Sequence, residues 1–67
     1  MTKEQEFFLY LLELYAANQD RKSGEVLKEW DDLGLTELIC DMYEKYHSEA
    51  IENSFEDIDK LILERQG

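Results

Sequence analysis

The sequence predicts an all-α protein, a compact bundle of four short helices over residues 3–18, 24–33, 36–48 and 55–65. Three observations predict this class. Apolar residues recur at spacings of three and four in each range, which is the period of a helix with one buried face. The chain has no proline that would interrupt a helix. Capping residues or glycine stand at the boundaries. A chain of 67 residues is expected to form one domain, residues 1–67.

The first predicted helix, residues 3–18, is apolar over most of its circumference. Thr2 and Gln5 match a capping box at its start, since the Thr hydroxyl accepts a backbone N–H while the Gln side chain reaches back. The apolar side chains cover an arc of roughly 250°, which suits a central helix surrounded by the other three. The outer edge of this arc, where we expect a second chain to bind if the side chains are exposed, consists of Leu9, Leu12 and Ala16.

The helix predicted over residues 24–33 has signals at both ends. Ser23 is expected to be the N-cap, because its hydroxyl can accept a free backbone N–H of the first turn. Gly34 is expected to end the helix in a left-handed conformation, which glycine adopts without steric cost. In that arrangement Leu35 folds back on Trp30, the largest side chain of the apolar face.

The last two helices are predicted over residues 36–48 and 55–65. Glu49 would fall on the apolar face of the first of these, so that helix is expected to end or bend near its last residue. Ser54 and Asp57 resemble a second capping box, which would open the final helix. The apolar faces of the three shorter helices centre on Trp30, Tyr46 and Ile58.

Composition restricts the kind of partner. The chain carries 17 Asp and Glu against 7 Lys and Arg, a formal net charge of −10. This charge disfavours binding to nucleic-acid phosphates and to anionic membranes, so a charged partner is expected to be basic. No secretory signal is evident, and the apolar run of the first helix is too short to span a bilayer. Cys40 is the one cysteine, which fits a reducing cytoplasm.

Two acidic residues occupy unfavourable positions in their predicted helix. Asp31 and Asp32 lie in the last turn of the second predicted helix, where the helix dipole disfavours negative charge. Lys28, four residues before Asp32, offsets part of this cost. A solvated helix end is one interpretation, and contact with a basic partner is the other. We therefore include both acids in the candidate interface.

Four further residues are weak functional candidates: His47, Glu44, Asp57 and Asp59. Cys40 shares a helical face with His47, but their backbones lie about 10.5 Å apart, too far for a nucleophilic dyad. Glu44 and His47 have the Glu-x-x-His spacing of di-iron bundles, which need a second such motif and two more glutamates. Asp57 and Asp59 lie in an expected first helical turn, where acids offset the helix dipole. One chain is therefore predicted to bind no metal or cofactor and to carry no catalytic residue.

Short motifs extend over nearly the whole chain: Phe8 to Tyr15 with Ala16, Glu25-Val26-Leu27 with Trp30, Gly34-Leu35, Met42-Tyr43 with Tyr46-His47, and Phe55-Glu56-Asp57-Ile58-Asp59. Together they resemble a family of short, uncharacterised bacterial proteins, a domain of unknown function. His47 and the Glu56 to Asp59 stretch match its characteristic positions. The resemblance implies gene neighbours similar to ADP-ribosyltransferases, and hence an antitoxin-like role. It transfers no catalytic residue.

These observations favour a non-enzymatic protein–protein interaction module. Its partner is expected to be a basic protein or a second copy of the chain, rather than nucleic acid or a membrane. The alternative is a small metal-binding protein or enzyme, assembled at a dimer interface around His47 and Glu44.

Overall fold

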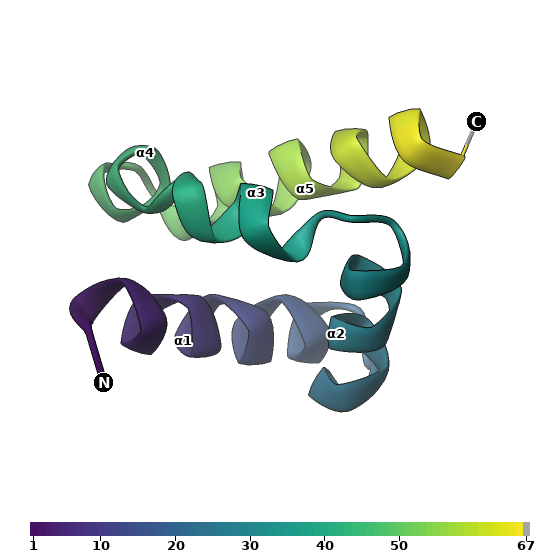
Figure 1. Ribbon diagram of the computed structural model, residues 1–67, viewed down its shortest axis with the longest axis horizontal. Coiled ribbons are helices and arrows are strands. Elements are labelled where there is room, and N and C mark those ends of the chain that lie inside the picture. The colour runs from purple at the N-terminus through teal and green to yellow at the C-terminus, as the bar shows by residue number, and fades with distance from the viewer. Residues whose placement is uncertain (67) are drawn as a thin grey trace.

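Five helices arranged in two layers make up the computed structural model, which describes residues 1–66 (Figure 1). One layer holds α1 and α2, and the other holds α3, α4 and α5. No strand occurs within the described residues, so the all-α prediction is confirmed. The five helices are α1 (Lys3–Asn18), α2 (Ser23–Asp32), α3 (Thr36–Asp41), α4 (Tyr43–Ser48) and α5 (Ile51–Gln66).

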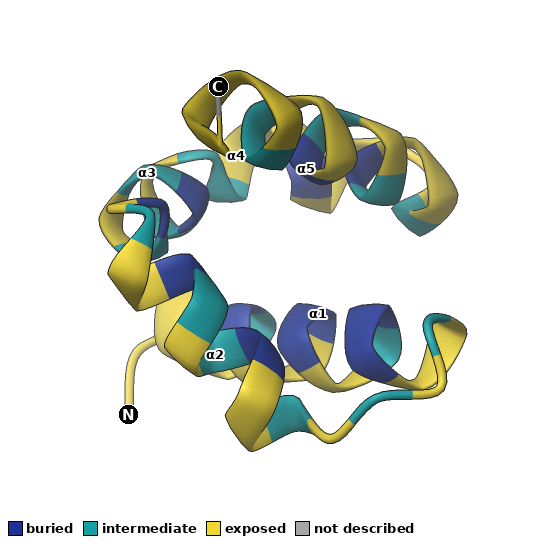
Figure 2. Cartoon of the chain, turned by 90° about the vertical axis from the view of Figure 1, so that its right-hand side faces the viewer, coloured by how far each residue is buried: buried dark blue, intermediate teal, exposed yellow. Residues whose placement is uncertain are grey.

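The first helix, α1, packs on α2, α3 and α4, while α4 also packs on α5. Figure 2 shows the buried segments of α1, α2, α3 and α5 turned toward the space between the two layers. The molecule measures 30 × 21 × 20 Å. None of its helices, over the residues described, combines the length and apolarity needed to cross a membrane. The packing of α2, α3 and α4 thus covers part of the apolar arc of α1, while Leu9 and Tyr10 stay exposed.

Aromatic side chains fill the centre of the core. Trp30 is fully buried, and its ring lies 5.5 Å from that of Tyr15 and 5.7 Å from that of Phe8. Tyr46 and Ile58, the expected centres of two other helical faces, are also buried. Burial of each such side chain stabilises the fold by about 1.5–3 kcal/mol before the cost of ordering it. Three helical faces therefore meet where the apolar pattern predicts.

The start of α1 and the end of α2 have the local hydrogen bonds that the sequence predicts. The Gln5 amide donates to Thr2 Oγ1 at 3.1 Å, and the Thr2 amide donates to Gln5 Oε1 at 3.0 Å, so the capping box is confirmed. Gly34 has φ +71°, and the Leu35 amide donates to the Trp30 carbonyl at 2.7 Å. The Gly34 amide donates to the Asp31 carbonyl at 3.1 Å. These bonds form the predicted Schellman turn.

The predicted helix over residues 36–48 is two helices, because it is interrupted at Met42. This residue has φ −84° and ψ 11°, and its amide is shared between the carbonyls of Leu38 and Ile39. Such tightening of a last turn is common at helix ends. The axis of α4 then turns away from that of α3 (Figure 1), and Tyr46 becomes buried.

The start of the final helix differs from the prediction by four residues. The helix α5 begins at Ile51, and Ser54 is a fully buried helical residue rather than an N-cap. Ile51, Ser54 and Ile58 follow one another at helical spacing on the inward side, so burial extends the helix toward its N-terminus. The prediction for Ser23 was also wrong, because Ser23 lies inside α2 and Lys22 occupies the N-cap without a side-chain bond.

Candidate functional site

The predicted apolar edge of α1 is only partly exposed. Leu9 is 47% exposed, whereas Leu12 and Ala16 are buried at 4% and 2%. The chain reverses after α1, where the Arg21 amide donates to the Ala16 carbonyl at 2.9 Å, and α2 then packs on α1. A second chain was expected at this edge only where its side chains are exposed, and Leu12 and Ala16 do not meet that condition. Leu9 is the member of the edge that solvent reaches.

Leu9 borders an open apolar pocket of about 380 Å³. The pocket lies between the N-terminal half of α1 and the C-terminal end of α3, and its lining residues are Met1, Gln5, Phe8, Leu9 and Cys40. Phe8 is nearly buried and is backed by the Trp30 ring, so this wall of the pocket is continuous with the core. Cys40 contributes a half-buried thiol from the other side. The pocket therefore presents an apolar surface whose Phe8 wall packs directly on the core.

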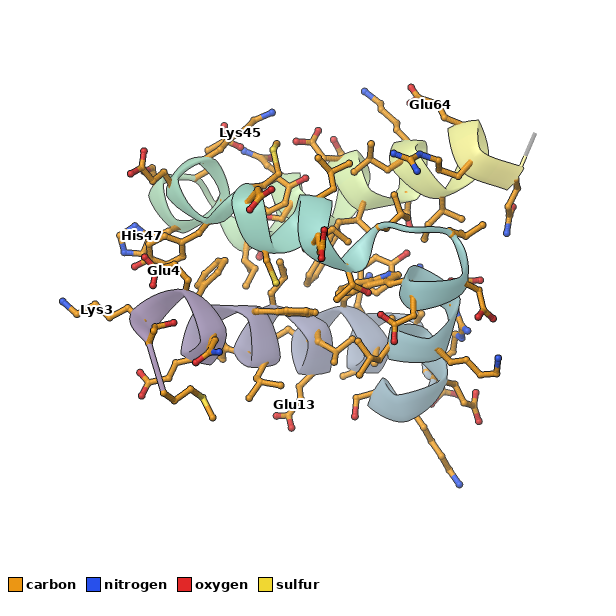
Figure 3. All side chains as sticks on the ribbon, in the orientation of Figure 1. Lys3, Glu4, Glu13, Lys45, His47 and Glu64 are labelled. Atoms are coloured by element: carbon orange, nitrogen blue, oxygen red, sulfur yellow. The ribbon has the colours of Figure 1, made fainter. Side chains whose placement is uncertain are left out.

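The helices that line this pocket carry exposed acidic side chains. Glu6 and Glu13 are exposed on α1, three residues before and four residues after Leu9, and therefore share its helical face. Figure 3 shows Glu13 pointing away from the layer of α3, α4 and α5. On α3, burial raises the pKa of the Cys40 thiol, and the charges of Asp41 and Glu37 raise it further. The pocket thus lies in a negative electrostatic environment.

The two unexplained acids of α2 have partners within the chain. Asp32 forms an ion pair with Lys28 at 3.0 Å, as the spacing predicted. Asp31 accepts a hydrogen bond from the Thr36 hydroxyl across the α2–α3 turn. Both carboxylates remain exposed. Asp31 also borders a hollow of about 250 Å³ with Glu37, which is one helical turn from Cys40. Glu37 of the Asp31 hollow and Cys40 of the Leu9 pocket are therefore one turn apart on α3.

His47 packs against two aromatic side chains at the end of the bundle. Its ring stacks on Tyr43 at a centroid distance of 4.9 Å and meets the edge of Phe7 at 6.1 Å. Figure 3 places His47 at the outer end of α4. Glu44 is exposed on the same helix, and its carbonyl accepts a hydrogen bond from the Ser48 hydroxyl. Over residues 1–66 no group of three or more His, Cys, Asp and Glu side chains is placed to hold a metal ion.

The acids of the last helix connect it to the rest of the fold. Because α5 begins at Ile51, Asp57 and Asp59 lie beyond its first turn, and the expected dipole explanation was wrong. Asp57 pairs with Lys45 of α4 at 3.0 Å, and this bond raises the pKa of the Lys45 ammonium. Asp59 accepts hydrogen bonds from the Tyr15 hydroxyl at 2.5 Å and from Gln19 Nε2 at 3.2 Å. Both carboxylates thereby hold α5 in place.

A second pocket, of about 390 Å³, surrounds the Asp59 cluster; its lining residues are Tyr15, Gln19, Arg21, Glu29, Asp59, Ile62 and Leu63. Arg21 and Glu29 form an ion pair at 3.1 Å. Burial, and then the bond to Asp59, raises the pKa of Tyr15 above its usual value. The sequence shows no signal for this cluster, because 44 residues separate Tyr15 from Asp59.

The fold and these surfaces define a class: a small, acidic, all-α protein with an apolar pocket open to solvent. Comparison with known families gives the particular one. The chain belongs to the family described as a protein of unknown function (DUF3791), whose model matches residues 6–65. The match confirms the expected membership of a short family of unknown function. No curated protein and no solved structure matches the chain.

Proposed function

We propose that this protein is a non-enzymatic interaction module that binds a basic protein partner. The observation that carries the proposal is the combination of an exposed apolar pocket at Leu9 with a net charge of −10. Interface centres are apolar and are depleted in charge, while the charged rim guides association and selects the partner. An apolar pocket on acidic helices suits a basic protein.

The specific form of this proposal is an antitoxin-like role in the bacterial cytoplasm. The resemblance to neighbours of ADP-ribosyltransferase-like proteins motivates it, and the small size and acidity of the chain agree with it. Binding by such a module neutralises its partner by covering a surface, so the module needs no catalytic group of its own. The reduced Cys40 fits the proposed compartment.

Capture of partners from the native host tests the proposal. The tagged full chain is used as bait, and retained proteins are identified by mass spectrometry. We expect one predominant basic protein, released when salt rises from about 0.1 M to about 1 M, because the Debye length falls from about 10 Å to about 3 Å. An acidic predominant partner, or the bait retaining only further copies of itself, would contradict the basic-partner proposal.

A further inference from the structure

The Leu9 pocket has the form of a receptor for a side chain. Four of its five lining residues are apolar or a thiol, namely Met1, Phe8, Leu9 and Cys40. Its volume of about 380 Å³ lies near the lower end of ligand pockets, which occupy roughly 300–1,000 Å³. Leu9 remains 47% exposed and Met1 80% exposed, so this apolar surface has no cover within the described chain. A partner group that fills this pocket would be apolar and about the size of one side chain.

Charge indicates what carries that side chain. The two helices that line the pocket carry one lysine, Lys3, and five acids: Glu4, Glu6, Glu13, Glu37 and Asp41. Figure 3 shows Lys3 extending outward from the N-terminal end of α1. A second copy of the chain would bring another charge of −10 to these acidic helices, and like charges oppose association. A cationic partner segment meets complementary charge instead.

A second acidic surface continues from the pocket. Glu37 borders the hollow of about 250 Å³ that Asp31 and Gly34 also line. The same carboxylate lies one turn from Cys40 on α3 and raises the pKa of its thiol. A segment anchored at Leu9 and extending along α3 therefore encounters an apolar pocket first and exposed carboxylates next. This order defines the sequence pattern that the surface selects.

We propose that the pocket between Phe8, Leu9 and Cys40 is the docking site for a basic segment of the partner, which inserts one large apolar side chain and places Lys or Arg residues against Glu37 and Asp31. The inference rests on the proposed function and makes it specific. It names the surface and the chemistry of the segment that binds there.

Selection from a displayed library of random peptides against the immobilised full chain tests this pattern before the partner itself has been identified. We expect enriched peptides to combine a large apolar residue with two or more Lys or Arg residues. The best peptide is then synthesised and titrated by calorimetry. Leu9→Gln is expected to weaken its binding at least about thirtyfold, the scale of an interface hot spot.

Leu63 provides a matched control, because it is another exposed leucine, at 70%, on the distant part of α5. Leu63→Gln is expected to change the affinity less than about twofold, as surface substitutions outside an interface do. Glu37→Gln should weaken binding and reduce its salt dependence, whereas Glu64→Gln, on α5, should do neither. Thermal unfolding of each variant verifies the fold, and half-exposed Leu9 makes Leu9→Gln a mild change.

Amide chemical-shift mapping on the unmodified protein provides a readout that needs no variant. We expect the peptide to shift residues 5–9 and 37–41 most. A basic peptide that shifts other residues, or binds Leu9→Gln as tightly as wild type, overturns the docking site but leaves the basic-partner proposal standing. Selection of acidic peptides, or of none, contradicts both. A light-scattering mass that doubles with concentration and is restored to 8.0 kDa by Leu9→Gln assigns the pocket to a second copy and overturns the inference.

Discussion

The Tyr15 hydroxyl of α1 donates a hydrogen bond of 2.5 Å to the Asp59 carboxylate of α5 and so joins the first long helix to the last. Gln19 Nε2 supports this bond by donating to the Tyr15 oxygen at 2.7 Å. The Phe55 ring meets Tyr15 edge-on at 5.7 Å, so apolar packing surrounds the polar contact. The position of α5 therefore depends on a pair of residues that are distant in sequence.

Removal of this hydroxyl is expected to weaken the fold. Tyr15→Phe keeps the buried ring but deletes the donor to a charged acceptor, so we expect the free energy of unfolding to fall by about 1–2 kcal/mol. Urea denaturation measures the change. Tyr10→Phe is the control, because Tyr10 is 57% exposed, and such a surface change is expected to stay within about 0.5 kcal/mol. Equal effects of the two substitutions would exclude a stabilising role for the Tyr15–Asp59 bond.

The same substitution at Tyr46 is expected to act in the opposite direction. The Tyr46 hydroxyl is buried and finds no hydrogen-bond partner among residues 1–66. Tyr46→Phe removes this unsatisfied group and keeps the packing, so stability at pH 7 should be unchanged or rise by up to about 1 kcal/mol. Urea denaturation again provides the measurement. A loss as large as that of Tyr15→Phe would show that the hydroxyl is satisfied in solution.

Alkaline pH should destabilise the protein through its buried phenols. Burial, followed by the charges of Asp57 and Glu49, raises the pKa of Tyr46 to about 12, compared with about 10 in an unfolded chain. The folded state therefore retains a proton that the unfolded state loses. This contribution is complete below about pH 10 and disappears as pH rises through about 12, with a slope of up to about 1.4 kcal/mol per pH unit.

Unfolding midpoints measured between pH 9 and about pH 12 check this dependence. Tyr15 adds to it in the same direction, because its pKa is also raised above the ordinary value. Tyr46→Phe should reduce the alkaline loss of stability. A midpoint independent of pH over this window, or an unaltered dependence in the variant, would contradict the burial of the Tyr46 phenol.

Two glycines should respond oppositely to alanine. Gly34 has φ +71°, a conformation that L side chains rarely adopt, so Gly34→Ala is strained although a methyl group there would make only ordinary contact with the Arg65 guanidinium at 3.5 Å. We expect a loss of about 1–2 kcal/mol in the free energy of unfolding. Gly24 lies in α2 with open space around it, so Gly24→Ala should stabilise by up to about 1 kcal/mol. Thermal unfolding distinguishes the two, and a tolerated Gly34→Ala would contradict the left-handed turn.

Features set by near neighbours in the chain could be predicted. The Thr2–Gln5 capping box, the Schellman turn at Gly34 and the Lys28–Asp32 pair each join residues at most five positions apart. Their geometry depends on helix and turn stereochemistry, which is the same in any protein. The net charge and the apolar periodicity likewise require only residue types.

Features that depend on packing between distant segments of the chain could not be predicted in the same way. Leu12 and Ala16 are buried and Leu9 is exposed, although helical periodicity places all three at one edge. Asp59 was expected to offset a helix dipole, yet it binds Tyr15 from the far end of the chain. Periodicity gives the direction of a side chain around its own helix axis. It contains no information on which other segment of the chain packs against that side chain.

The sequence by itself determined the all-α class, the acidity, the local caps and the aromatic centre at Trp30, because periodicity, charge and short-range hydrogen bonding act within one helix or turn. Tertiary structure alone decided the break at Met42, the early start of α5 at Ile51 and the pocket beside Leu9 and Cys40. Each of these depends on burial against residues far along the chain, and burial is a property of the assembled helices.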